Sequence, residues 1–253
     1  MTPILGARIP IAAVSGRVTL TKYLESLSGL VGLWSYNETS GNLINLAPAT
    51  IGSLDGVPAG PTQGATGPGG DAGLSYSYDG GGAANDTVTI ANDATLAGMT
   101  DQTWGFLINL ASTGEGGTAR VLSWANETAY YFRTSGSERY RWVVDYDTTD
   151  AVGQTAGSAL PLDTWHWVIV GHDGTTKKNL IYQGINSVLT ALALTTDTTG
   201  VGTLQAPAGV LEFGNNSALT STIDGSIAYA FALNVAPDTI ETELAQVVRL
   251  SGV

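Results

Sequence analysis

The sequence predicts an all-β protein, an antiparallel jelly-roll β-sandwich with a short C-terminal helix and an N-terminal arm. Three observations favour this class. Short segments with period-two apolar alternation recur along the chain, separated by turns rich in its 33 glycines. Only 13% of the residues are charged. The 253 residues contain no cysteine, which excludes disulfides and thiolate metal sites, but a chain this long can bury a full core without them.

A hairpin at residues 162–184 is the clearest local signal. Trp165 and Trp167 alternate with His166 at the period of two that is typical of a strand covered on both faces. An Asp-Gly pair at residues 173–174 then supplies turn chemistry before the return strand. We expect the two tryptophans to fill the gap between two sheets, which makes both of them structural.

After the first strand, a glycine- and proline-rich surface loop is expected at residues 48–73, in which a short strand near Ser53-Leu54 is the alternative, and the remaining strands follow at intervals marked by turns. The strands outside the hairpin are expected at residues 32–34, 74–78, 87–90, 102–110, 119–124, 128–134, 139–146, 187–194, 210–214 and 223–233. A helix is expected at residues 238–249, where Asp238 and Glu241 can form a capping box before an apolar stripe.

Residues 1–28 are expected to form an N-terminal arm, and residues 29–253 a single sandwich domain. The arm carries three basic side chains and one acidic one, a net charge of +2 by 3 − 1, whereas the whole chain carries −12. Leu20 and Leu24 could share one face of a short helical stretch near its end. A basic, irregular segment of this kind can become ordered against a partner. The alternative is a strap packed on the sandwich.

Four motifs follow one another in the order found in a known family. They are Gly32–Trp34 with Glu38–Asn42, Tyr78-Asp79-Gly80 with Val88-x-Ile90, the W-H-x-V hairpin closed by Tyr182-Gln183-Gly184, and Ile223–Ile227. Together they resemble a laminin-G-like domain of the concanavalin A-like lectin/glucanase superfamily, over roughly residues 30–250. The resemblance implies a lectin-like sandwich. The sequence departs from the pattern at Trp167, where a second histidine is common, and at Gln183, where aspartate is usual.

Catalysis is not expected, although the superfamily includes β-glucanases. A retaining glycosidase needs two carboxylic acids about 5–5.5 Å apart, and the paired-glutamate strand motif is missing. Asp145 and Asp147 are more simply explained as a salt-bridged strand end beside Arg141. His166 is expected to be a packed core residue, and His172 to be solvated at the hairpin turn. A glycan hydrolase or lyase is therefore the less favoured alternative.

A candidate binding face lies on the segments 128–134 and 139–146. Alternation along the second segment places its arginines and Asp145 on one side, and the first segment offers a tyrosine and an arginine together. Aromatic rings and guanidinium groups can hold sugar hydroxyls or carboxylates. The candidate ligand-binding residues are Tyr131, Arg133, Arg139, Arg141 and Asp145. The alternative is cross-strand charge pairing on a solvated face.

Calcium is the one ion that the resemblance suggests. Asp79 and Asp224 occupy motif positions in the family pattern, so both are candidate Ca²⁺ ligands. The alternative is that the Asp-Gly pairs at these two positions only form turns.

The net charge of −12 argues against a nucleic-acid partner, because phosphate contacts need clustered Lys and Arg. No apolar run is long enough to span a membrane, and no convincing signal peptide is present. A lectin-like sandwich that is preceded by an arm outside the family resemblance, and that has no signal peptide, resembles modules displayed on tailed-phage virions.

The predicted function is therefore that of a non-catalytic virion surface protein, either a capsid decoration or a tail accessory. It would be made in the bacterial cytoplasm and attached to a capsid or tail protein through residues 1–28. The sandwich would face outward and could bind cell-surface glycans. A free carbohydrate-binding module is the alternative, and a homo-oligomer is compatible with the sequence.

Overall fold

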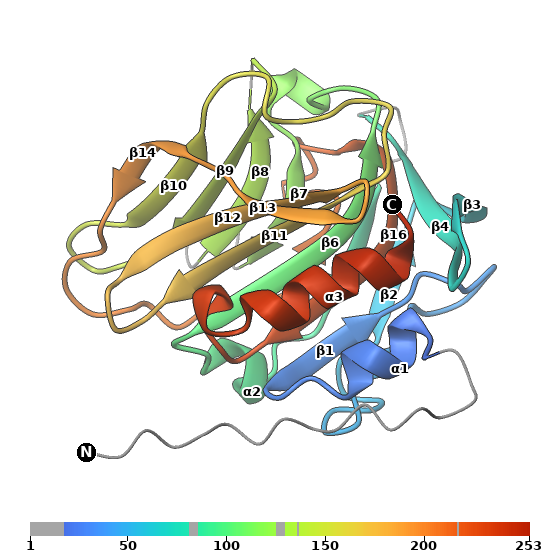
Figure 1. The fold of residues 1–253 in the computed structure, drawn as a ribbon, viewed down its shortest axis with the longest axis horizontal. Helices are drawn as coiled ribbons and strands as arrows, with labels where there is room; N and C mark the ends of the chain where they lie inside the picture. The colour runs from blue at the N-terminus through green and yellow to red at the C-terminus, as the bar shows by residue number, and fades with distance from the viewer. Residues whose placement is uncertain (1–17, 81–85, 125–129, 136, 217) are drawn as a thin grey trace.

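The computed structural model describes residues 18–80, 86–124, 130–135, 137–216 and 218–253. In these residues two antiparallel sheets of eight strands each form a sandwich (Figure 1). Helices α1 (Leu20–Glu25) and α3 (Glu241–Ser251) lie on the outside of one sheet, which we call sheet A. The other is sheet B. The predicted β-sandwich with a short C-terminal helix is confirmed.

Sheet A has the strand order β13-β12-β11-β6-β16-β4-β3, and β1 also pairs with β16. Its strands are β1 (Leu30–Trp34), β3 (Thr62–Gly69), β4 (Ala72–Asp79), β6 (Gln102–Leu110), β11 (His166–Asp173), β12 (Lys178–Ile185), β13 (Val188–Ala191) and β16 (Asp224–Leu233). The predicted hairpin is β11-β12, joined by a turn at residues 174–177. Strand β11 of this hairpin pairs with β12 on one side and with β6 on the other, so it is an interior strand of the sheet.

Sheet B has the order β14-β10-β9-β8-β7-β15-β5-β2. Its strands are β2 (Gly56–Ala59), β5 (Thr87–Ile90), β7 (Arg120–Trp124), β8 (Tyr130–Ser135), β9 (Arg139–Val144), β10 (Ala151–Thr155), β14 (Leu194–Thr198) and β15 (Leu211–Phe213). The single strand expected at 187–194 is wrong: β13 and β14 lie in different sheets, and the chain crosses between them at residues 192–193.

The surface loop expected at residues 48–73 is also wrong, because β2 and β3 lie in it. Both are edge strands: β3 pairs with β4, and β2 pairs with β5, with one further bridge from Gly56 to Leu43. Glycine and proline are tolerated in edge strands, where a missing donor or side chain costs the sheet little. Composition alone therefore hides these two strands. Short helices α2 (Ala94–Ala97), η1 (Glu115–Gly117) and η3 (Pro237–Thr239) complete the elements discussed below.

The main core lies between the two sheets. Four tryptophans, Trp34, Trp104, Trp124 and Trp142, are fully buried there with Phe106, Phe132 and Phe213. Trp34 and Phe106 both pack edge-on against Phe213, at centroid distances of 5.2 and 5.7 Å. The shared face expected along residues 102–110 is confirmed, because its aromatic and aliphatic side chains point into this core.

A second core lies on the outer face of sheet A, under α1 and α3. Trp167, Ile169 and Tyr182 belong to it, and Trp165 packs at its margin. The prediction that both tryptophans fill the gap between the sheets is therefore wrong. Alternation along β11 instead turns His166, Val168 and Val170 toward sheet B, while the larger tryptophans pack under the helices.

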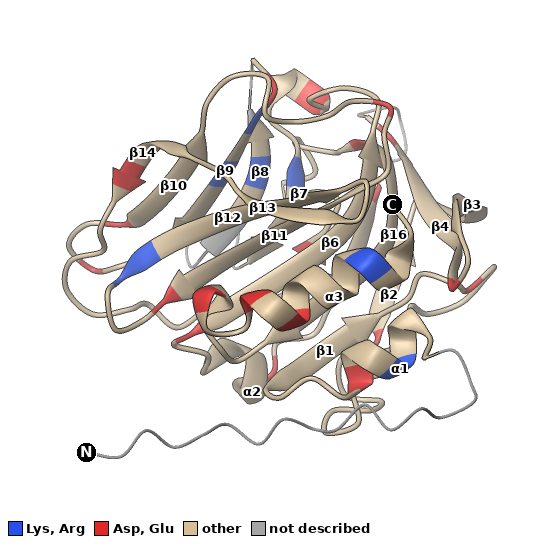
Figure 2. Ribbon diagram, in the orientation of Figure 1, with Lys and Arg blue, Asp and Glu red and all other residues tan. Residues whose placement is uncertain are grey.

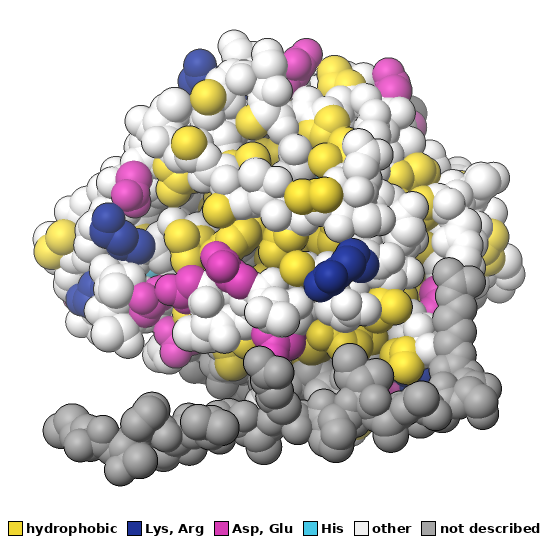
Figure 3. All heavy atoms as spheres, viewed as in Figure 1, with side chains coloured by type: hydrophobic (Ala, Val, Ile, Leu, Met, Phe, Trp, Pro, Cys, Tyr) yellow, Lys and Arg dark blue, Asp and Glu magenta, His cyan; other side chains and the backbone are white. Residues whose placement is uncertain are grey.

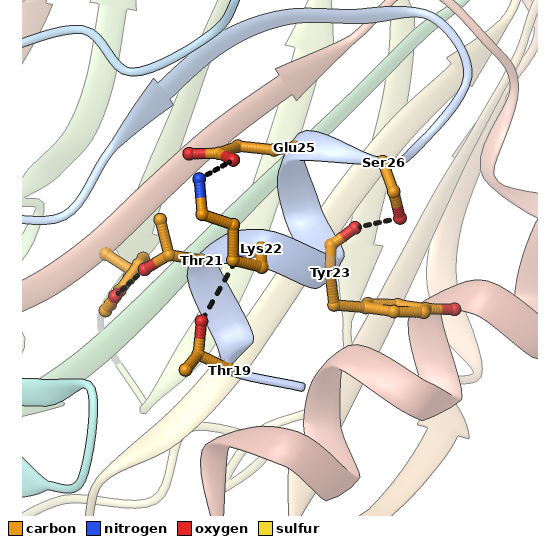
Figure 4. Close-up of polar contacts among 7 residues, drawn as sticks. Thr19, Thr21, Lys22, Tyr23, Glu25 and Ser26 are labelled. Atoms are coloured by element: carbon orange, nitrogen blue, oxygen red, sulfur yellow. Dashed lines mark hydrogen bonds and ion pairs between the residues drawn. The ribbon is translucent and has the colours of Figure 1, made fainter. Parts of the chain in front are cut away.

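Helix α1 belongs to the folded domain. Thr19 caps it, its hydroxyl oxygen accepting a hydrogen bond from the backbone N–H of Lys22 at 3.3 Å (Figure 4). Leu20 and Leu24 are buried in the second core, and the Thr21 hydroxyl bonds the Tyr229 hydroxyl at 2.7 Å. For residues 18–28 the structure thus favours the packed strap over a separate arm. Residues 1–17 of the predicted arm lie outside the described residues.

Helix α3 begins at Glu241, three residues after the predicted start. The expected capping box is wrong: Asp238 lies in η3, and Ile240 precedes the helix without a side-chain cap. The Glu241 carboxylate instead accepts a hydrogen bond from the Tyr182 hydroxyl at 2.8 Å, which ties the first turn to β12. Gly252 ends the helix with φ 75°, the left-handed conformation common at this position.

Among the described helices, none has both the length and the apolar character that a membrane crossing requires.

Candidate functional site

The outer face of sheet B carries most of the predicted ligand-binding residues. Along β9, Tyr140, Trp142 and Val144 are buried in the main core, as the alternation predicts. Arg139 and Arg141 consequently point away from the core and are partly exposed. The sequence therefore predicted correctly which side of this strand faces outward.

Strand pairing brings three arginines into one row. Arg133 of β8 lies directly opposite Arg141 of β9, and Arg120 of β7 lies opposite Arg133. We call Arg120, Arg133 and Arg141 the arginine row. Figure 2 shows the Lys and Arg colour side by side on β7, β8 and β9. Arg120 was not predicted as a site residue, because its place depends on a register shift between residues 120 and 122 that the sequence does not reveal.

The row continues across the sheet with neutral polar side chains. Gln154 of β10 is opposite Arg141, and Thr196 of β14 is opposite Gln154. Neighbouring strands lie about 4.8 Å apart, so the five positions extend over roughly 20 Å. The Arg141 Nη1 donates a hydrogen bond to Gln154 Oε1 at 3.3 Å, and the Arg120 Nη1 donates one to the Thr118 carbonyl at 3.4 Å. These five positions are therefore all polar, with both hydrogen-bond donors and acceptors among them.

The arginines of this face differ in exposure. Arg120 is only 6% exposed, whereas Arg133, Arg139 and Arg141 are each partly exposed. The Nε atoms of Arg139 and Arg141 are buried and have no hydrogen-bond partner within the described ranges. Like charges that lie directly opposite on neighbouring strands are destabilising. Cross-strand pairing thus places like charges at facing positions of the row.

Two other predicted ligands are placed less closely with the row. The Tyr131 backbone in β8 lies opposite Val143, two residues before Arg133, but its side chain lies outside the described part. Asp145 is four residues beyond Arg141, a separation of about 13 Å along an extended strand. Burial first, and then the hydrogen-bonded carboxyl of Asp150, raises the pKa of Asp145 to about 6. Asp145 thus has another carboxyl as its close neighbour.

Asp147 does not form a carboxylate pair with Asp145. Its Oδ1 accepts hydrogen bonds from the Thr203 backbone N–H at 2.9 Å and from the Thr148 hydroxyl at 3.1 Å. These bonds hold the pKa of Asp147 below its usual value. It is an exposed loop residue that stabilises the connection near β14, not a partner in catalysis.

Both histidines join the two sheets in the interior. The Tyr140 hydroxyl bonds His166 Nε2 at 2.6 Å, and His166 Nδ1 bonds the Thr164 carbonyl at 2.8 Å. Six residues farther along each strand, the Tyr146 hydroxyl bonds His172 Nε2 at 2.8 Å. The prediction that His166 is a packed core residue is confirmed.

The prediction that His172 is solvated is wrong. Its side chain is fully buried, and its Nδ1 bonds the Asn179 Oδ1 at 2.8 Å. The Asn179 amide then donates to the carbonyls of Trp142 and Ala151. Burial lowers the pKa of His166 to about 4 and also lowers the pKa of His172. Both rings are therefore neutral structural bridges near pH 7.

The two candidate calcium ligands are neighbours. Asp79 of β4 lies directly opposite Asp224 of β16, and the nearby Asp86 carboxylate accepts a hydrogen bond from the Asp79 backbone N–H at 2.9 Å. Calcium takes about six to eight oxygen ligands. The described residues contain no group of three or more His, Cys, Asp or Glu side chains that could hold a metal ion.

Two hollows lie beside α3, on the sheet A side of the molecule. One, of about 370 Å³, is lined by Tyr182, Leu189, Ala245 and Arg249 among others; a second, of about 300 Å³, also reaches Arg249. Figure 3 views this face and shows acidic side chains gathered over the start of α3. The residues lining the two hollows include none of the outer-face arginines of sheet B, so the two faces are separate candidates.

Comparison with known proteins identifies the fold. No family model matches the sequence, and no curated protein sequence matches it. The structure is similar to the binding domain of botulinum neurotoxin DC in complex with rat synaptotagmin II, with a TM-score of 0.60 and 11% identity over 87% of this chain and 52% of that chain. It is also similar to the botulinum neurotoxin type G receptor-binding domain, with a TM-score of 0.57 and 12% identity over 88% and 52%.

A third similar structure is the sialidase of Trypanosoma rangeli with the inhibitor DANA, with a TM-score of 0.59 and 11% identity over 88% of this chain and 32% of that chain. The chain thus spans about half the length of the toxin chains and a third of the sialidase. At these identities the likeness shows the fold alone. The laminin-G resemblance rests on the sequence motifs. The chain is a β-sandwich similar in fold to these receptor-binding domains and to part of a sialidase.

Proposed function

We propose that this protein is a non-catalytic glycan-binding module whose binding face is the outer face of sheet B. The observation that carries the proposal is the arginine row. It places three guanidinium groups beside one another on a face that α1 and α3 leave uncovered. Guanidinium groups and amide side chains such as Gln154 are suited to hydrogen-bonding the oxygen atoms of a sugar.

The similar structures are compatible with this proposal. One botulinum neurotoxin DC binding domain was solved in complex with SialylT, and the sialidase was solved in complex with the inhibitor DANA. This chain covers 51% of the former and 32% of the latter, so the likeness does not locate a ligand site. The synaptotagmin complex supplies the second candidate class, a module that binds a protein receptor.

The geometry of the acidic residues supports the non-catalytic part of the proposal. The Asp150 carboxyl that neighbours Asp145 helps to raise the pKa of Asp145, and its Oδ1 accepts a hydrogen bond from the Tyr146 backbone N–H at 3.2 Å. Asp147 is engaged by backbone and hydroxyl donors. The two histidines are buried between the sheets and cannot reach a substrate on either outer face.

The proposal is tested by a glycan array combined with a reducing-sugar assay on the bound glycans. We expect binding without turnover. Release of reducing ends that is lost in an Asp145→Asn/Asp147→Asn variant would show an enzyme. If the protein binds no glycan but captures a purified receptor protein, the second candidate class replaces the first.

The virion role is a more specific proposal that rests on the sequence. Its support is the basic character of residues 1–28 beside an acidic chain. The packing of Leu20 and Leu24 on sheet A leaves residues 1–17 as the segment to test for attachment. Co-purification of the protein with phage particles, and its loss after deletion of residues 1–17, is the expected result. If the deletion variant still co-purifies with the particles, residues 1–17 are not required for attachment.

Calcium binding is likewise proposed only from the resemblance and from the opposition of Asp79 and Asp224. A ligand of the native state raises Tm in a concentration-dependent manner. Calcium should therefore raise Tm, a chelator should reverse the rise, and Asp79→Asn or Asp224→Asn should abolish it. An unchanged Tm at millimolar calcium would show that the native protein does not bind the ion.

A further inference from the structure

We propose that two copies of this chain associate through the free edge of β13, so that sheet A of one copy continues into sheet A of the other. The two copies are related by a two-fold axis at Thr190 of β13. This contact is separate from the glycan-binding face of sheet B and goes beyond the proposed function.

The free edge of β13 lacks the protection found on the other strands that end the two sheets. A free edge offers unpaired backbone groups to another chain, and proline, charge or a bulge usually protects it. Strand β2 contains Pro58, and β3 contains Pro68 and two register shifts. Strand β14 contains Asp197, which pairs with Lys178 at 3.2 Å. Strand β13 is Val-Leu-Thr-Ala, and its pairing with β12 has no register shift. Of these four described strands, β13 is therefore the one most open to pairing.

The hydrogen bonds between β12 and β13 determine which backbone groups of β13 face outward. The Leu192 N–H donates to the Ile181 carbonyl at 2.8 Å. This bonded pair lies one step beyond the Tyr182–Ala191 pair of the ladder. Bonded and non-bonded pairs alternate in an antiparallel ladder, so the backbone groups of Leu189 and Ala191 point away from β12. Three of the four residues of β13 are exposed, which leaves these groups accessible to another strand.

Pairing of two β13 strands then has a definite register. A two-fold contact uses the same surface on both copies. With the axis at Thr190, Leu189 of each copy faces Ala191 of the other, and each pair can exchange both of its N–H···O bonds. Val188, which is 59% exposed in the single chain, would lie opposite Leu192 of the second copy.

Helix α3 lies along β13 and runs in the opposite direction (Figure 1). Its first residue bonds Tyr182, the β12 partner of the last residue of β13. Near its other end, Val248 packs against Gly184, the β12 partner of Leu189. The middle of the helix, near Ala245, is therefore level with the middle of β13, where the axis passes.

Two charges of α3 make this edge self-complementary. Glu241 and Arg249 are exposed, and both line the hollow of about 370 Å³ between α3 and β13. They lie about 12 Å apart along the helix, equally far from Ala245. An axis level with Ala245 therefore places Glu241 of each copy opposite Arg249 of the other. Within the described residues Arg249 has no ion-pair partner. Opposite charges that meet twice favour a second copy over an unrelated strand.

The contact leaves the sheet B site of each copy intact. The axis is perpendicular to sheet A, so both copies keep α3 on one side of the joined sheet and sheet B on the other. Glycan binding by each copy therefore does not require the contact. A protein that binds glycan as a monomer would contradict the dimer and leave the proposed function standing.

The test is the mass of the full chain in solution, measured by sedimentation velocity at roughly 1–100 µM protein, a range suited to a small contact. Ala191→Pro removes an outward N–H without a bond to β12, and Ala191→Ser is its matched control because it keeps the N–H. Arg249→Glu and Glu241→Arg are measured alone and as an equimolar mixture. Circular dichroism and Tm establish that each variant is folded.

We expect wild type and Ala191→Ser to form a dimer whose fraction rises with concentration. Ala191→Pro, and each charge variant alone, should dimerise roughly tenfold or more weakly. Mixing the two charge variants should restore association, because every facing pair then has opposite signs. Wild type that stays monomeric over the whole range would overturn the proposal. A dimer that neither Ala191→Pro nor the charge variants weaken would overturn it too, and so would a mixture that associates no better than its components.

Discussion

The two outer faces of the sandwich are built from the same alternation but have opposite characters. On sheet A the outward side chains are large and apolar, among them Trp167, Tyr229 and Phe231, and α1 and α3 cover them. On sheet B the outward side chains of β7 to β9 include four arginines, and neither helix covers them. One face has become a second core, while the other carries charged and polar side chains.

This difference separates stability from binding. A fully buried large apolar side chain contributes about 1.5–3 kcal/mol relative to the exposed state, and the second core contains many of them. Partly exposed charged side chains such as Arg141 contribute little by comparison. Substitutions on sheet A should therefore unfold the protein, whereas substitutions on sheet B should change what it binds.

The largest effect is expected from Trp167→Ala. The substitution leaves a cavity under α3 and should lower the free energy of unfolding by roughly 3–5 kcal/mol. Arg141→Ala, on the other outer face, should change it by less than about 1 kcal/mol. Urea unfolding of the two variants compares them directly. Equal stability losses would contradict the division between the faces.

Leu24→Ala tests whether α1 is part of the sheet A layer. Leu24 is completely buried, so its truncation should cost roughly 2–5 kcal/mol. Lys22→Ala on the exposed side of the same helix should be nearly neutral. Deletion of residues 1–17 keeps Leu20 and Leu24 and should leave Tm almost unchanged. A Leu24→Ala variant that melts like wild type would show that α1 is dispensable to the domain.

Low pH should destabilise the folded protein through His166, which is buried between the two sheets. The folded pKa of His166, about 4, lies below the usual value of 6.5, so the unfolded chain binds its proton first. Stability from this group is complete above about pH 6.5 and declines as the pH falls toward 4, by about 3 kcal/mol in all.

The measurement is urea unfolding at pH 7, 5.5 and 4 for wild type and His166→Gln. The loss between pH 7 and pH 4 should be smaller in the variant, because it lacks the titrating ring. An equal loss of unfolding free energy between pH 7 and pH 4 in the two proteins would mean that His166 does not couple folding to pH.

The smallest effect is expected at the far end of β9. Asp145 has a folded pKa of about 6, above its usual 3.8, so its contribution to stability falls as the pH rises between these values. Asp145→Asn should therefore raise Tm at pH 7, on the order of 2 °C because the group is partly exposed, and not at pH 4. A lower Tm at pH 7 would indicate that the charged carboxylate is stabilising.

The sequence was sufficient for the fold class and for the orientation of side chains within a strand. Alternation alone separated Arg139 and Arg141 from Tyr140 and Trp142. It did not show which side of β11 meets sheet B, because both sides of that strand are apolar and Trp167 fits either environment. Helices α1 and α3 determine this orientation, because they cover the side of β11 that carries Trp167, and both lie far from β11 in the sequence.

The candidate site could be predicted only in part. Arg133 and Arg141 were expected on one face, but their direct opposition depends on strand register, which distant contacts and turn geometry set. Arg120 was missed because a bulge in β7 aligns it with Arg133. His172 was misjudged because its place beside a turn indicates exposure, whereas Tyr146 and Asn179 enclose it.

The most direct test of the account compares the two faces in a single glycan-array experiment. Arg133→Gln/Arg141→Gln alters sheet B, and Ala245→Arg fills the hollow beside α3 without entering a core. The account predicts that the first variant loses glycan binding and the second binds like wild type. Binding that survives the first variant and disappears in the second would place the site on sheet A and contradict the central claim.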